Sequence, residues 1–107
     1  MGLTEEHFTA YQDARSLIVE LVRTAPPGRA LLDYGRVRLA LDDLHGGTGF
    51  PPAQPVTTTD RRALVDAAVE AMRALATFDV DPLALELCVA DLQDAWAQER
   101  EQLEGAR

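Results

Sequence analysis

The stretch Gly-Gly-Thr-Gly-Phe-Pro-Pro-Ala-Gln-Pro-Val-Thr-Thr-Thr, residues 46–59, carries no charge and divides the chain into two halves. It holds three of the seven glycines and three of the six prolines, and both residue types interrupt regular structure. Gly46 and Gly47 are typical of a helix C-terminus, and Thr58 or Thr59 is typical of the residue that caps the next helix. We therefore expect residues 46–59 to connect two helical segments.

Two helices are expected before this connector, over about residues 4–23 and 29–44. In the first, apolar residues recur at helical spacing, Thr4 is a suitable N-cap, and the Pro-Pro-Gly at residues 26–28 would end the helix. The second has the same periodicity but contains Gly35, which weakens a helix. Part of it also alternates as a strand would, at Val37, Leu39 and Leu41. A lone strand would have no partner in this chain, so we favour a helix, either continuous or broken at Gly35.

Two further helices are expected after the connector, over about residues 60–78 and 82–103. Asp81 and Pro82 are a typical N-cap and first helical residue. Short links within each half make both helix pairs antiparallel hairpins. The sequence thus predicts an all-α fold in one domain, residues 1–107: a small four-helix bundle of two antiparallel hairpins, with the Gly/Pro-rich connector crossing one end.

The composition excludes several classes of function. The net charge is −8, whereas nucleic acids and anionic membrane surfaces attract clustered positive charge. The chain shows no leader or membrane-spanning pattern, and its one cysteine cannot form an intrachain disulfide. All ten basic residues other than histidine are arginine, as is common in GC-rich genomes. We expect a protein of a bacterial cytoplasm that binds neither nucleic acid nor membrane.

The connector itself is a poor phosphate loop. A Walker-type loop needs a lysine after its glycines, but this chain has no lysine, and prolines follow the glycines. Two arrangements stay open. Either Phe50 and Val56 fold onto the core, or the connector is mobile and Phe50, Pro51 and Pro52 form a binding loop.

Three sets of polar residues are candidates for a chemical site. Asp42, Asp43 and His45 provide too few ligands for zinc, and an exposed acidic helix face explains them. His7 has no companion beyond Glu6 and is expected at the surface. Cys88 lies on the apolar face of the last helix, where we expect a buried structural thiol. The sequence indicates no catalytic residue and no cofactor.

Carboxylates on the last two helices suggest one enzymatic alternative. All-helical nucleotide pyrophosphohydrolases hold magnesium with carboxylates on facing helices, using a Glu-x-x-Glu and a later Glu-x-x-Asp. The spacings in this chain match neither motif. The residues that such a metal site would use are Asp66, Glu70, Glu86, Asp91 and Asp94.

The function expected from the sequence is therefore a non-enzymatic protein-interaction or regulatory module that presents a helix face. The end of the last helix, with Trp96, Arg100 and Leu103, is the expected contact for a protein partner or for self-association as a homodimer. The alternatives are the metal-dependent enzyme described above and an acidic antagonist of a basic protein.

Overall fold

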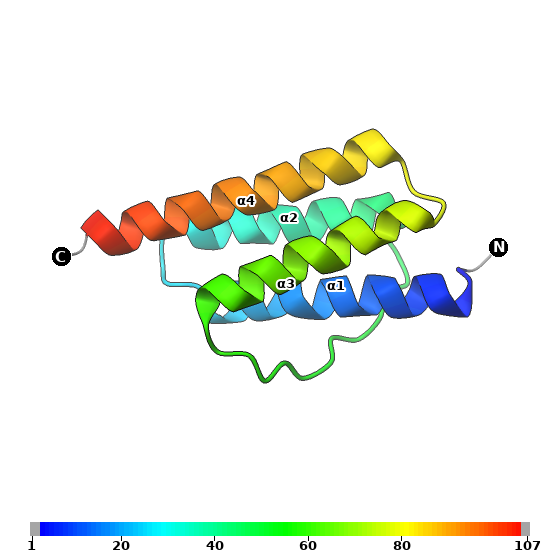
Figure 1. Cartoon of the computed structure of the whole chain (residues 1–107), viewed down its shortest axis with the longest axis horizontal. Helices are drawn as coiled ribbons and strands as arrows, with labels where there is room; N and C mark the ends of the chain where they lie inside the picture. The colour runs from blue at the N-terminus through cyan, green and yellow to red at the C-terminus, as the bar shows by residue number, and fades with distance from the viewer. Residues whose placement is uncertain (1–2, 106–107) are drawn as a thin grey trace.

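The computed structural model describes residues 3–105 and is an all-α four-helix bundle, which confirms the fold class (Figure 1). The helices are α1 (Glu5–Thr24), α2 (Arg29–Leu44), α3 (Arg61–Ala74) and α4 (Pro82–Gly105). A 3-10 turn, η1 (Leu75–Thr77), follows α3. None of the described helices is both long enough and apolar enough to cross a lipid bilayer.

The helix ends follow from local hydrogen bonds. The Thr4 hydroxyl accepts from the His7 amide, as expected for an N-cap. The cap of α3 is Asp60, whose carboxylate accepts from the Ala63 amide, so the assignment of Thr58 or Thr59 was wrong. Asp81 accepts from two amides at the start of α4, those of Leu83 and Ala84.

The second helix is continuous through Gly35. It ends in a Schellman arrangement, in which the Gly46 amide donates to Asp43 O and the Gly47 amide donates to Asp42 O. Both glycines have positive φ, 93° and 75°, a conformation that only glycine adopts at low cost. The two glycines therefore stop α2 and turn the chain toward α1.

The four helices form a ring in which α1 packs on α2 and α3, and α4 packs on the same two helices. The core between them is built from residues such as Ile18, Leu41, Met72 and Leu92, all fully buried. Neighbouring helices run antiparallel, whereas α2 and α3, which the connector joins, run in the same direction (Figure 1).

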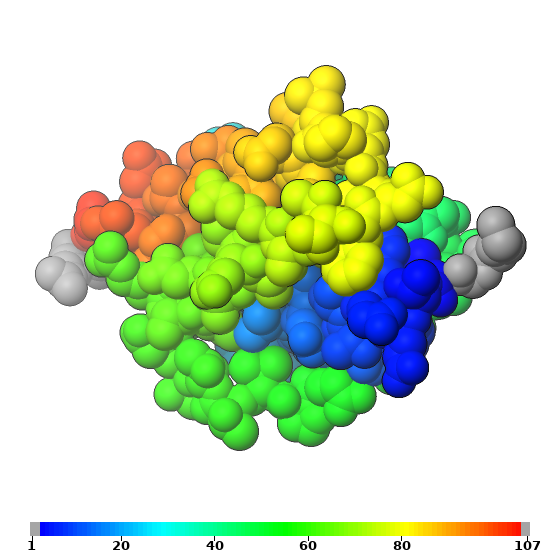
Figure 2. Space-filling view, turned by 45° about the vertical axis from the view of Figure 1, so that its right-hand side comes forward, coloured from blue at the N-terminus to red at the C-terminus, as the bar shows by residue number. Residues whose placement is uncertain are grey.

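The connector does not cross one end of the bundle, as we had expected, but returns along its full length. It leaves α2 near the start of α1, and α3 begins near the end of α1, because Arg61 contacts Leu21 O and the Thr24 hydroxyl. Its path lies against α1 (Figures 1 and 2). A helix of 20 residues is about 30 Å long, which explains why the connector needs fourteen residues.

Backbone groups of the connector bond to side chains of α1. Gln12 donates to Pro52 O at 2.9 Å, and the Gln54 amide donates to the Ser16 hydroxyl at 2.8 Å. The ring of Phe50 is 47 % exposed and lies under the Arg15 guanidinium, while Pro51 is buried. Of the two residues considered for contact with the core, Val56 packs against it and Phe50 does not. Pro51 and these hydrogen bonds attach the rest of the connector.

Candidate functional site

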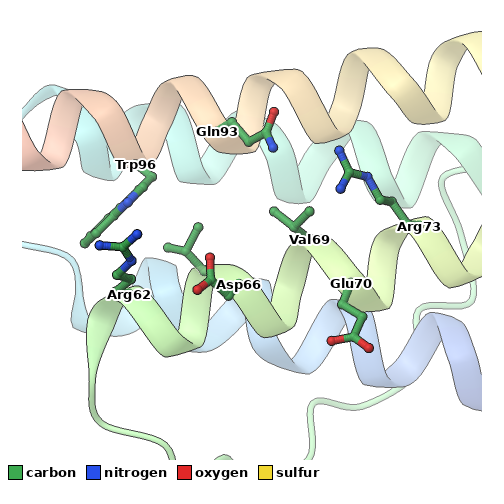
Figure 3. A pocket seen from close by; sticks show the side chains of 8 residues that line it. Arg62, Asp66, Val69, Glu70, Arg73, Gln93 and Trp96 are labelled. Carbon is green, nitrogen blue, oxygen red and sulfur yellow. The ribbon is translucent and has the colours of Figure 1, made fainter.

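A surface groove between α3 and α4 contains the expected contact residue Trp96 (Figure 3). Its volume is about 480 Å³. Trp96 extends from α4 toward the start of α3 (Figure 3), and Arg62 lines the same groove. Val65 and Val69 contribute apolar surface to the groove, and its remaining residues are polar: Arg62, Asp66, Glu70, Arg73 and Gln93. The groove therefore has a mixed lining, with Trp96 and two valines among charged and amide side chains.

The other two expected contact residues, Arg100 and Leu103, lie beyond the groove, toward the end of α4. Trp96, Arg100 and Leu103 are spaced i, i+4 and i+7, which places them on one side of the helix. Trp96 is half-buried, whereas Arg100 is exposed and Leu103 is 49 % exposed. Arg61, the first residue of α3, bonds to Glu99, so α4 extends beyond α3 and no residue of α3 lies opposite Leu103.

The five carboxylates of the enzymatic alternative do not meet. Asp66 and Glu70 line the α3/α4 groove, Asp91 and Asp94 line a different groove, between α2 and α4, and Glu86 is exposed. Over residues 3–105, no group of three or more His, Cys, Asp or Glu side chains is arranged to hold a metal ion. The carboxylates therefore lie on separate surfaces.

His7 and Asp42 are buried, so placing His7 at the surface and Asp42 on an exposed face was wrong. The two histidine rings meet, with 2.9 Å between His7 Nε2 and His45 Nε2, and His45 Nδ1 lies 2.9 Å from Leu41 O. A carbonyl only accepts, so Nδ1 of His45 carries a proton and its Nε2 accepts from His7. Tyr11 stacks on the ring of His45. The histidine pair thus joins the start of α1 to the end of α2, and the bond to Leu41 O fixes the tautomer of His45.

Asp42 lies beside this pair as the acceptor of several hydrogen bonds. It accepts from the Tyr11 hydroxyl at 2.6 Å and from Arg15 Nε at 3.0 Å. Arg15 is itself only 13 % exposed. The phenol pKa of Tyr11 is raised, chiefly by burial and then by its bond to Asp42. This network locks α1 to α2, and Arg15 extends it to the connector through Pro51 O.

The histidine pair makes stability depend on pH. Burial, and next the neighbouring His45, lower the pKa of His7, while Asp79 opposes them. A histidine whose folded-state pKa is lowered binds fewer protons when folded, so its stabilising effect is present above its unfolded pKa, about 6.5, and is lost as the pH falls below it. We expect the free energy of unfolding, measured by urea denaturation, to fall as the pH is lowered below about 6.5. His7→Gln keeps a donor for His45 and should flatten this slope, and equal slopes in both proteins would contradict the assignment.

A second buried network joins α2, α3 and α4 at the opposite end of α1. Glu99 is completely buried and accepts from the Tyr34 hydroxyl at 2.8 Å and from Arg61 at 3.0 and 2.6 Å. The bond to Glu99 is the main reason that the pKa of Arg61 is raised. We did not predict this network. The sequence did contain a signal for the burial of Glu99, because Glu99 follows the buried Leu92 and Ala95 at helical spacing.

The side chains of the one serine and the one cysteine in the sequence are held within the fold. The hydroxyl of Ser16 donates to Gln12 O and accepts from the Gln54 amide. The thiol of Cys88 is buried and lies 3.7 Å from Val37 O. Burial, with a smaller effect of Asp91, raises the pKa of Cys88 to about 12. The thiol therefore stays protonated at neutral pH, which agrees with a structural role.

Exposed leucines on α2 and α4 form a surface that sequence reasoning missed. Leu32 and Leu39 on α2 are 66 % and 56 % exposed, and Leu83 and Leu87 on α4 are 69 % and 59 % exposed. Their spacings of seven and four residues place each pair on one side of its helix. Neither pair belongs to the buried stripe of its helix. The spacing of these leucines in the sequence could therefore have indicated that they are exposed.

Comparisons with known proteins give no relative for this chain. No protein-family model matches it, and neither a curated protein nor a solved structure does.

Proposed function

We propose that this chain is a non-enzymatic protein-interaction module and that the α3/α4 groove with the end of α4 is its binding surface. The observation that carries the proposal is the placement of Trp96. Its half-buried ring forms one wall of an open groove, and tryptophan and arginine are the residue types that most often dominate binding energy. Arg62 lines the same groove, and the exposed Arg100 and Leu103 lie further along α4.

The shape of this surface favours an extended or helical segment of a partner. The groove follows the line between two helices, and the stripe from Trp96 to Leu103 lengthens it by two turns. A segment with apolar residues at helical spacing would place one of them against Val69 and Trp96 and another over Leu103. The net charge of −8 favours a basic partner by electrostatic steering.

The proposal places the protein in a bacterial cytoplasm. The single cysteine and its buried, protonated thiol suit a reducing compartment. The arginine-only basic composition supports a bacterial origin with a GC-rich genome.

Site-specific photo-crosslinking tests the proposal. A photoreactive phenylalanine analogue is placed at Arg100 or Leu103, and at Thr9 as an exposed control on α1. We expect a discrete adduct with another protein in cells when the analogue is at 100 or 103, and none when it is at 9. No adduct at any position, or equal adducts at all three, would overturn the proposed binding surface.

A further inference from the structure

We propose that the contact between His7 and His45 is a pH-sensitive switch that holds one end of the bundle closed. When the pair takes up protons, the start of α1, the end of α2 and the η1 turn separate locally, while the rest of the bundle stays folded. The pair lies at the opposite end of α1 from the Glu99 network, so the inference goes beyond the proposed function and does not depend on it.

Three segments that are distant in sequence meet at this histidine pair. His7 lies in the first turn of α1, and its ring stacks on that of Phe78, which follows η1, with 4.7 Å between the ring centroids. His45 ends α2, and its ring stacks on Tyr11, one turn further along α1. These segments lie together at the end of the bundle where α1 begins (Figure 1). Separating the two histidines therefore weakens the contacts of α1 with both α2 and η1.

The hydrogen bonds of the pair limit the number of protons that it can hold while closed. Among its four ring nitrogens, His45 Nδ1 donates its proton to Leu41 O, and the two Nε2 atoms share a single proton. A proton on His45 Nε2 would remove the acceptor and set two N–H groups against each other. Only His7 Nδ1 is left to accept a proton in the closed pair. The closed pair thus takes up at most one proton, whereas two separated rings take up two.

The burial of His7 makes even the first of these protons unfavourable. The ring is only 5 % exposed, and burial and the neighbouring His45 lower its pKa. Asp79, which lies between η1 and α4, opposes this effect, but its side chain is exposed. A protonated His7 therefore gains little from the residues that follow η1.

The other elements around the pair offer no free counter-charge either. From α2, the buried Asp42 lies beside the pair, but it already accepts from Tyr11 and Arg15 of α1. The ion pair with Arg15 neutralises its charge. The connector, residues 46–59, carries no charge at all. Protons on the histidines are thus better accommodated when the rings separate and reach water.

Acid therefore shifts the equilibrium toward the open end. The separated rings bind more protons than the closed pair, so the equilibrium constant for opening rises as the pH falls below about 6.5, the ordinary pKa of histidine. The Glu99 network contains no histidine. The opposite end of the bundle should consequently stay closed over the same range of pH.

Hydrogen exchange of the full chain, measured by mass spectrometry, tests the switch. The exchange is measured at about pH 7.5 and 5.5, on either side of the ordinary pKa of histidine, and corrected for the intrinsic rate at each pH. We expect the protection of amides in the first two turns of α1, the last turn of α2 and η1 to fall at least about tenfold at the lower pH. Amides around Glu99 in α4 should keep their protection.

Glutamine substitutions provide the matched variants. In His7→Gln, the side-chain amide can donate to neutral His45 and, after rotation, accept from protonated His45. The contact then survives acid, and the change in protection should shrink to less than about threefold. His45→Gln should behave in the same way and provides a second variant, with urea unfolding at neutral pH as the folding control for both.

Three results would each overturn the switch. The first is equal protection of the start of α1 at both pH values in the wild-type chain. The second is a loss of protection spread evenly over all four helices, which would show global unfolding. The third is a loss as large in the glutamine variants as in wild type, which would assign the effect to carboxylates such as Asp42.

Discussion

Replacing Glu99 with alanine is expected to lower the free energy of unfolding by about 3–5 kcal/mol, as removal of one partner from a buried ion pair does. The carboxylate is fully buried, and its loss leaves the Tyr34 hydroxyl without its acceptor and the Arg61 guanidinium without its carboxylate partner. These two groups come from α2 and α3, so the substitution loosens the attachment of α4 to both helices.

A matched control is available two residues further along α4. Glu101 is exposed, and Glu101→Ala should change stability by less than about 0.5 kcal/mol. Urea denaturation followed by circular dichroism measures both variants. Equal stability of the Glu99 and Glu101 variants would show that the Tyr34–Glu99–Arg61 network contributes nothing to holding the bundle together.

The second large effect is expected for Asp42→Ala, with a loss of about 3 kcal/mol. The substitution removes the acceptor of the Tyr11 hydroxyl and of Arg15, which is mostly buried. Arg15 also bonds to Pro51 O of the connector, so hydrogen exchange of the connector amides should become faster as well.

Asp43 provides the comparison, because it is adjacent in sequence but exposed. Asp43→Ala should leave both the unfolding free energy and the exchange of the connector close to wild type. A connector whose amides exchange equally fast in wild type and in the Asp42 variant would contradict the role of Arg15 as the link between α1, α2 and the connector.

The helices could be predicted because their signals are local. Thr4 and Asp81 cap helices through side chains that bond to amides two or three residues away, and the apolar periodicity of each helix reports its buried side. The direction of α3 could not be predicted in this way. The apolar periodicity of the helices is the same whether the connector crosses one end of the bundle or returns along its length. Only the length of the connector, residues 46–59, distinguishes the two paths.

The buried polar residues were missed because their partners are distant in sequence. His7 lies 38 residues from His45, and Glu99 lies 65 residues from Tyr34. Both continue a buried stripe, His7 with Tyr11 and Glu99 with Ala95, so the positions were visible in the pattern. Polar residue type argued against burial, and no local signal showed that a partner would satisfy it.

The candidate binding surface was predicted in part. The sequence predicted Trp96 and Leu103 as contact residues at the end of α4. Their relation to Arg62 and Val69 depends on how α3 packs against α4. The exposed leucines of α2 and α4 do not belong to the buried stripe of either helix, and single exposed leucines are common in proteins.

The most direct test of the interaction function is the affinity of the crosslinked protein for variants of the α3/α4 surface. We expect Trp96→Ala to raise the dissociation constant at least about 30-fold, the size of a hot-spot loss, with Leu103→Ser giving a smaller increase. Leu83 is exposed at the start of α4, outside the α3/α4 groove, so Leu83→Ser should bind like wild type. A Trp96→Ala protein that unfolds cooperatively and binds within about twofold of wild type would contradict the proposal that this groove is the binding surface.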